Sequence, residues 1–229
     1  MRRFRTVAVS VWLGLLLASQ VIAADLPDSA LPDLPALRAR MQQEFQRIQS
    51  YRVRIHVDIE MPGMTVRDKS VTLFYEYPDS FRYEAKGFAV LPRRSLNMNP
   101  DSLFAGLADP VISAPDDSLG RDNLRVLGVF REGSRLAEME YRIDTLHWVP
   151  THLLMRVDGQ LVMELETHYQ VAQGLWLPAH SEIRMTLQKD LQEFYEKLKM
   201  PMRRRKNLQE GLGRIAISYD PFDLKLRTP

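Results

Sequence analysis

The sequence predicts a mainly β protein in which helices accompany one large, strongly curved antiparallel sheet. Three observations lead to this prediction. One long stretch alternates strictly between apolar and polar residues, several shorter alternating stretches follow between turn signals, and apolar stripes at helical spacing occur in two places. The sheet is expected to have one solvated face, and the helices can cover the other.

The long alternating stretch is Tyr51–Met61. Every odd position is apolar or aromatic, and every even position is polar or charged. Successive side chains of a strand point to opposite faces, so a strand here has one wholly apolar face, whereas a helix would scatter the same residues around its axis. The run exceeds the typical strand length of about 5–6 residues, which favours a large curved sheet.

The first helix is expected just before this strand. Asp33 is its candidate N-cap, and Pro35 suits its first turn, where the missing donor costs nothing. The apolar stripe has spacings of four, four and three and consists of Leu37, Met41, Phe45 and Ile48. Such a stripe must dock on an apolar surface.

The remaining strands follow from alternation between turn signals. Asp158-Gly159 is typical of a tight hairpin, and Met61 to Met64 and Pro78 to Ser80 also read as turns. The first three strands are expected to form a meander. The expected strands after the first are 66–77, 81–91, 123–130, 136–144, 151–157, 160–170, 176–187 and 215–219.

Two segments are candidates for movable covers. Pro92–Arg121 contains four prolines and does not read as strand, but Asn99 and Pro100 open a short helix within it, expected over 99–107. A second helix is expected over 190–199. The apolar side chains proposed as lid residues are Leu103, Phe104, Leu107, Leu191, Phe194 and Leu198.

The first 24 residues read as a secretory signal peptide. Arg2, Arg3 and Arg5 precede the apolar run Val7–Leu17, and small residues follow at Ala23 and Ala24. The alternative, an uncleaved anchor, is disfavoured because the apolar run is shorter than the ~20 residues that span a bilayer. Export predicts a periplasmic location, with residues 25–229 as one domain.

Composition excludes several function classes. There is no cysteine, so disulfides, thiol catalysis and Cys-type zinc sites are ruled out. The formal net charge is +2, and removing the three arginines of the leader leaves −1. The basicity therefore belongs to the export signal and predicts no nucleic-acid partner.

Several stretches together resemble the LolA-like superfamily of periplasmic lipoprotein carriers. They begin with the helix at Leu37 and the Tyr51 strand. The others are Phe74–Tyr83, Tyr141–Asp144 with Trp148–Pro150, Asp158–Gln160, and Tyr169–Val171 with Gly174–Pro178. The resemblance implies an incomplete β-barrel whose concave apolar side is closed by helices. The superfamily also includes mycobacterial lipid-binding and sigma-factor regulator types.

The sequence departs from the carrier pattern at two positions. Carriers tend to have a basic residue before the hairpin proline, associated with latching the lid, and Tyr77 stands there in this chain. The long Pro92–Arg121 insertion replaces the Asp-Gly segment that usually follows the third strand. Both differences set the chain apart from the carriers proper.

The inward face of the first strands is the proposed ligand site. Burying each methylene of an acyl chain there is worth roughly 0.8 kcal/mol. The alternative is that side chains fill the space as an ordinary core. The proposed cavity residues are Tyr51, Val53, Ile55, Val57, Ile59, Leu73, Tyr75, Phe81 and Tyr83.

Catalytic and metal sites are not predicted. None of the five histidines has the i, i+4 spacing and acidic companion of a known metal motif. No Gly-x-Ser-x-Gly occurs, and Asp116-Asp117 lies in a proline-containing loop. We therefore expect no metal, no cofactor and no enzyme activity.

Two functions remain open at this point. The leading hypothesis is a periplasmic carrier for the acyl chains of a lipoprotein or lipid, working with an inner- or outer-membrane partner protein. The alternative is an envelope-sensing or protein-interaction module on the same fold, for which Tyr77 and the insertion argue. A cavity of several hundred Å³ would favour the carrier.

Overall fold

The computed structural model describes residues 31–85, 99–114, 123–132, 135–188 and 210–227, which lie within one unit spanning residues 31–229. Its strands are β1 (Ile48–Met61), β2 (Met64–Glu76), β3 (Ser80–Glu84), β4 (Leu107–Ser113), β5 (Asn123–Glu132), β6 (Arg135–Asp144), β7 (Val149–Val157), β8 (Gln160–Ala172), β9 (Leu175–Leu187), β10 (Gly211–Tyr219) and β11 (Asp223–Leu226). The helices are α1 (Leu34–Phe45) and α2 (Pro100–Leu103).

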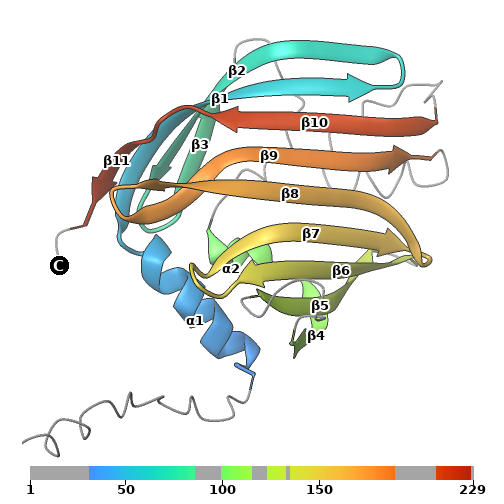
Figure 1. Cartoon of the computed structure of the whole chain (residues 1–229), viewed down its shortest axis with the longest axis horizontal. Helices are drawn as coiled ribbons and strands as arrows, with labels where there is room; N and C mark the ends of the chain where they lie inside the picture. Colours follow the sequence, from blue (N-terminus) through green and yellow to red (C-terminus); the bar gives the residue numbers. More distant parts are fainter. Residues whose placement is uncertain (1–30, 86–98, 115–122, 133–134, 189–209, 228–229) are drawn as a thin grey trace, which may run out of the picture. The chain divides into compact units, whose positions relative to one another are not determined.

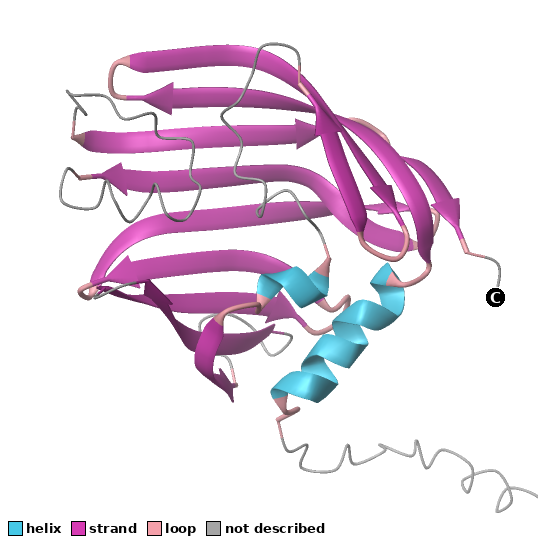
Figure 2. Ribbon diagram, turned by 180° about the vertical axis from the view of Figure 1, so that it is seen from behind, coloured by secondary structure: helices cyan, strands magenta, loops and turns pink. Residues whose placement is uncertain are grey.

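The described strands form one antiparallel sheet (Figure 1). Its order is β3-β2-β1-β10-β9-β8-β7-β6-β5-β4, and β11 pairs with β1. The sheet is open, since β3 and β4 stand at opposite ends of this path and are not paired with each other in the described part of the chain. The strands bend along their length (Figure 2). The prediction of a mainly β, antiparallel fold is confirmed at this level.

The alternation in β1 has the predicted consequence. Its five inward side chains, Tyr51, Val53, Ile55, Val57 and Ile59, are at most 3% exposed. The strand begins at Ile48 and not at Tyr51, so Ile48 belongs to β1, contrary to its assignment to the helical stripe. The helix has already ended at Phe45, where Gln46 caps it.

The predicted turns are also found. Asp158 and Gly159 both have positive φ, +52° and +74°, and Val157 pairs with Gln160 across them. This is the backbone of a tight two-residue hairpin, which the Asp-Gly dipeptide favours. Met61 likewise pairs with Met64, and β1, β2 and β3 form the expected meander.

Helix α1 begins as predicted. The Asp33 carboxylate accepts a hydrogen bond from the Ala36 amide at 2.8 Å, which satisfies one of the free donors of the first turn. The stripe residues Leu37, Met41 and Phe45 are buried. Phe45 packs against Tyr75 of β2, with ring centroids 5.1 Å apart.

The prediction that the insertion contains no strand is wrong. Residues 107–113 form β4, which pairs with β5, and α2 covers only Pro100–Leu103 of the helix expected over 99–107. Pro110 fits because β4 ends the sheet path and its register shifts between Ala108 and Val111. Strand β11 was not predicted either. The helix expected over 190–199 and the end of the third strand, to residue 91, lie outside the described residues.

The buried side chains form two clusters. The larger runs along β1, β2 and β6–β11 and includes Phe45 of α1. The smaller joins α1 and α2 to β5 and β6 and consists of Leu37, Met41, Phe104, Leu124, Val126, Tyr141 and Ile143. Helix α1 therefore contributes to both clusters.

A buried carboxylate stands out among the charged groups. Glu140 of β6 is 4% exposed. It accepts hydrogen bonds from Arg125 at 3.2 Å, Arg142 at 3.3 Å and Arg156 at 3.4 Å. Burial opposes its ionisation, but the hydrogen bonds from Arg125 and Arg142 outweigh burial and lower the pKa of Glu140. The carboxylate thus links β5, β6 and β7.

We predict that Glu140→Gln lowers the free energy of unfolding at neutral pH by about 2–3 kcal/mol, since charged hydrogen bonds are lost from a buried site. The loss should shrink as the pH falls below 4.5, because the lowered pKa of Glu140 stabilises the fold above that pH and ceases to do so in acid. Urea denaturation at several pH values measures both effects. Glu138→Gln, exposed on the same strand, is the control. Equal stability of the two variants would contradict this prediction.

Candidate functional site

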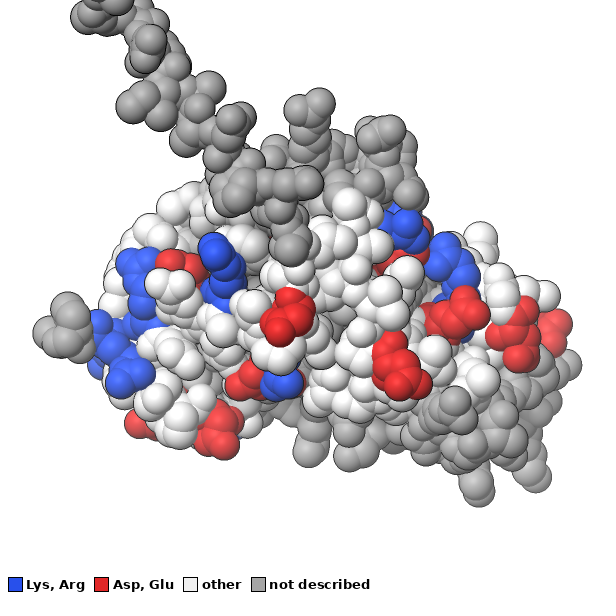
Figure 3. All heavy atoms as spheres, turned by 90° about the horizontal axis from the view of Figure 1, so that it is seen from below, with Lys and Arg blue, Asp and Glu red and all other residues white. Residues whose placement is uncertain are grey.

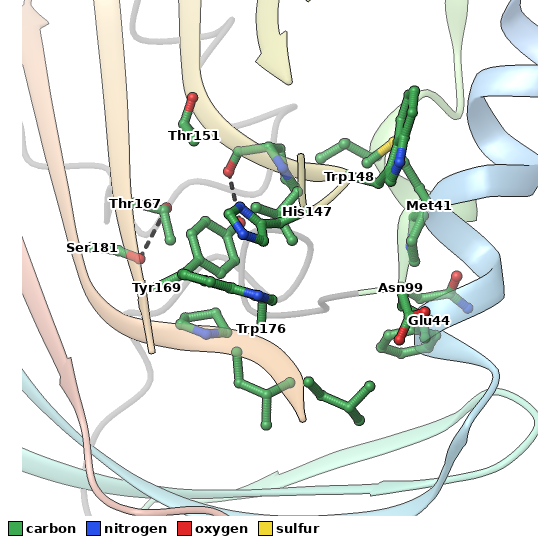
Figure 4. Close-up of a pocket in the computed structure, with 18 of the residues that line it drawn as sticks. Met41, Glu44, Asn99, His147, Trp148, Thr151, Thr167, Tyr169, Trp176 and Ser181 are labelled. Atoms are coloured by element: carbon green, nitrogen blue, oxygen red, sulfur yellow. Dashed lines mark hydrogen bonds between the residues drawn. The ribbon is translucent and has the colours of Figure 1, made fainter. Parts of the chain in front are cut away.

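The candidate site is a pocket with a volume of about 390 Å³. Residues from α1, α2, the start of β1, β6, the β6–β7 turn and β7–β10 line it (Figure 4). The volume lies within the range of about 300–1,000 Å³ that is typical of small-molecule sites. Much of the wall is aliphatic or aromatic, as shown by Met41, Phe45, Leu103, Leu153, Leu165 and Ile217.

Hydroxyl groups on the sheet side of the pocket are paired within the protein. The Thr167 and Ser181 hydroxyl oxygens lie 3.1 Å apart, and the Tyr169 hydroxyl donates to the Pro150 carbonyl at 2.6 Å. Burial raises the pKa of Tyr169 and of Tyr219, and a hydrogen bond with Ser181 partly opposes the effect on Tyr219. Both phenols therefore stay neutral, and this wall presents paired, uncharged groups to a ligand.

The β6–β7 turn is held by Asp144. Its carboxylate accepts hydrogen bonds from the backbone amides of Leu146 at 2.7 Å and His147 at 3.3 Å, and it contacts the His147 ring at 3.0 Å. The His147 ring lies against Trp176 of β9, with centroids 3.7 Å apart (Figure 4). These contacts bring the β6–β7 turn to the start of β9.

Trp148 completes the turn with an uncommon backbone conformation. Its φ is +56°, which a bulky residue rarely adopts. The ring faces α1, where the Arg40 guanidinium lies 5.1 Å from its centroid, and it lines the pocket near Met41 (Figure 4). Local backbone strain of this kind is often concentrated at functional sites.

Formal charge among the lining residues, histidines aside, is confined to one ion pair. Glu44 and Arg47 pair at 2.5 Å, and each side chain is about half exposed, at 48% and 47%. They stand at the C-terminal end of α1 and not among the buried apolar groups. The interior of the pocket therefore has no Asp, Glu, Lys or Arg side chain among its described lining residues, and its edge is polar.

The comparisons give a fold and no family. The chain resembles the crystal structure of a DUF1329 family protein from Desulfovibrio piger, with a TM-score of 0.51 over 84% of this chain and 92% of that one. The two chains share a fold. At 10% sequence identity the likeness extends no further than the fold. No protein-family model matches the sequence, and no curated protein does.

The nine predicted cavity residues do not line this pocket. Tyr51, Val53, Ile55, Val57, Ile59, Leu73 and Tyr75 are buried in the larger cluster, and Phe81 and Tyr83 pack against it. These side chains lie together, as expected, but they pack against one another as part of the protein core. The hollow lies farther along the same sheet, at β7–β10.

The predicted lid residues are divided. Leu103 lines the pocket, Phe104 is buried with its ring 5.3 Å from that of Tyr141, and Leu107 is half-buried in the smaller cluster. Leu191, Phe194 and Leu198 lie outside the described residues. The ligand role of all these residues stays a prediction.

Sequence reasoning missed the aromatic part of the site. Trp148, Tyr169 and Trp176 belong to stretches that carry the family resemblance, yet they were not predicted as lining residues. A signal was present, because Trp148-Val149-Pro150 and Trp176-Leu177-Pro178 share the order Trp, apolar, Pro. Trp148 lies in the β6–β7 turn and Trp176 at the start of β9, and both line the pocket.

The part of the chain that the structure describes holds no group of three His, Cys, Asp or Glu side chains suited to a metal ion. None of its helices is long and apolar enough to cross a bilayer.

His56 of β1 lies between two carboxylates, those of Asp68 and Asp220. Its Nδ1 is 2.7 Å from Asp68 and its Nε2 is 3.4 Å from Asp220. The hydrogen bond with Asp68 raises the pKa of His56, slight burial opposes this, and Asp220 adds to the increase.

We predict that an NMR titration gives a His56 pKa above 6.5, that Asp68→Asn lowers it, and that Asp220→Asn lowers it less because that contact is longer. Protonated His56 then stabilises the fold fully below pH 6.5, and this contribution is lost as the pH rises through the raised pKa. A His56 titration that is unchanged in Asp68→Asn would contradict the assignment.

Proposed function

We propose that the protein is a non-enzymatic carrier that binds the acyl chains of a lipoprotein or lipid in the described pocket. The observation that carries the proposal is the largely apolar hollow of about 390 Å³, whose one described lining pair of Glu and Arg stands at its edge. Each methylene that enters it from water gains roughly 0.8 kcal/mol, so a few methylenes already give useful affinity. Glu44 and Arg47 stand at the half-exposed edge of the pocket, so the polar head group of a bound lipid can remain in solvent there.

The proposal includes a half-barrel whose apolar side is covered by α1 and α2. Support comes from the contacts that join the helices to each other and to the sheet. Gln42 donates to Asn99 at 3.0 Å, and Arg38 pairs with Asp101 at 3.0 Å. The Tyr141 hydroxyl donates to the Leu103 carbonyl at 2.9 Å.

The helix contacts also suit a cover that opens. The Arg38–Asp101 pair is exposed, and exposed pairs contribute only about 0–1 kcal/mol each. Displacing α2 would exchange contacts of Leu103 for contacts with a ligand, so the two states differ little in energy. A ligand can enter the pocket only if the closed and open states differ this little in free energy.

No catalytic step belongs to the proposal. The Thr167 and Ser181 hydroxyls bond one another, and the tyrosine hydroxyls of the wall stay protonated because burial raises their pKa. The leader at residues 1–24 supports action in the periplasm, between an inner- and an outer-membrane partner protein.

We predict that the protein extracted from the periplasm carries lipid in native mass spectrometry and that Leu165→Trp weakens fatty-acid affinity about tenfold or more. Leu165 lines the pocket, and a larger side chain there displaces two or more methylenes of the guest. The matched control is Leu161→Trp on the same strand, because Leu161 is 46% exposed and lies outside the pocket.

The outcomes separate the carrier from its rival. Equal affinity of the two variants, or no bound lipid in the wild-type protein, would count against the carrier. A single protein partner retained by Leu165→Trp would instead favour the envelope-sensing or protein-interaction module. Ile55 and Ile59 belong to the cavity face that the sequence predicted, but Ile55→Glu and Ile59→Glu do not test ligand binding. Both residues are fully buried in the packed cluster, and a glutamate there would prevent folding.

A further inference from the structure

An exposed apolar rim borders the mouth of the pocket. Leu146 is 65% exposed, Val171 59% and Trp176 38%. Val171 and Trp176 are direct partners across the β8–β9 hairpin, so their side chains share a face. The His147 ring lies against Trp176, and His147 follows Leu146 in the chain, which joins the three side chains into one strip. Leu146, His147 and Trp176 also line the pocket, so the strip continues into it.

The rim is rigidly presented. Asp144 accepts the Leu146 and His147 amides, which fixes the β6–β7 turn. The turn of the β8–β9 hairpin is tied to β11, because Gln173 donates to the Leu224 carbonyl at 3.2 Å. Exposed apolar side chains that are held in place in this way need an explanation other than a loose loop.

Basic side chains lie at the same end of the described unit. Lys225 of β11 and Arg227 are exposed, and Arg227 contacts the Gln46 carbonyl beside Arg47 at the pocket edge. Carboxylates lie there too, among them Glu44, already paired with Arg47, Asp223, and Asp79, which acts with Arg227 on the Tyr75 hydroxyl. Figure 3 shows Lys and Arg side chains at the left end of that face, which is the β11 end in Figure 1, with Asp and Glu side chains among them.

We propose that this rim docks on the surface of a phospholipid bilayer that contains anionic lipids, with Leu146, Val171 and Trp176 entering the headgroup region. This inference rests on the proposed carrier function, for which it names the surface where acyl chains enter or leave. Tryptophan and leucine beside basic residues are the side chains that anchor proteins at a bilayer interface.

The size of the rim favours a bilayer over a protein partner. A stable protein interface buries about 800 Å² on each partner, whereas the exposed apolar part of the rim consists of three side chains. Shallow insertion of a few side chains, aided by attraction to anionic headgroups, needs no larger patch. Docking in this orientation would place the pocket mouth directly against the lipid.

Flotation with vesicles tests the docking. We expect wild-type protein to float with vesicles of phosphatidylethanolamine and phosphatidylglycerol more than with pure phosphatidylcholine vesicles. Val171→Asp should weaken flotation about tenfold, since burying one such side chain shifts an equilibrium by roughly that factor. Leu146→Asp combined with it should weaken flotation further. The matched control is Leu212→Asp: Leu212 is 80% exposed near the start of β10, whose other end, Tyr219, lines the pocket.

The pocket variant separates this inference from the carrier function. Leu165→Trp should float like wild type while binding a free fatty acid about tenfold or more weakly, and Val171→Asp, which lies outside the pocket wall, should bind the fatty acid normally. Loss of flotation in Leu165→Trp would overturn the docking role of the rim, because membrane association would then be lipid capture by the pocket. Unchanged flotation of Val171→Asp would overturn it too, as would an equal loss in Leu212→Asp or self-association that Val171→Asp abolishes.

Discussion

Strand β1 is the element on which the remaining structure depends. It pairs with β2 along one edge, and along the other edge first with β11 and then with β10. Its five alternate side chains are completely or almost completely buried, so a change of register by one residue would expose the whole set. The register of β1 therefore fixes the position of β10 and, through it, of β9 and β8, which form part of the pocket wall.

The same sheet is filled at one side and hollow at the other. Around β1 and β2, the rings of Tyr51 and Tyr75 stack at 5.3 Å and Phe45 of α1 packs beside them. Toward β7–β10 the inward residues include Thr167 and Ser181, which are small, and the helices approach through Met41 and Leu103. Smaller inward groups on the sheet leave a volume that side chains do not occupy.

The sequence predicted the β elements well because alternation reports burial directly. Tyr51 to Ile59, the Asp158-Gly159 hairpin and the Asp33 cap are local patterns that tertiary contacts did not override. Strand β4 escaped prediction because Pro110 suggests a loop unless the strand is known to end the sheet. The position of the pocket could not be predicted. Alternation of apolar and polar residues shows which side chains of a strand face inward, but it does not show whether other side chains fill the space that they face.

The location of the pocket follows from where α1 ends and the turns begin. Phe45 closes the helix above Tyr75, while Met41 one turn earlier lies beside Trp148 in the pocket wall (Figure 4). Trp148 reaches that position through its positive φ, and Asp144 holds the turn that carries it. A backbone conformation that is unfavourable for tryptophan persists because Arg40 and α1 receive its ring. The turn thus forms a wall of the pocket at a conformational cost that the helix contacts offset.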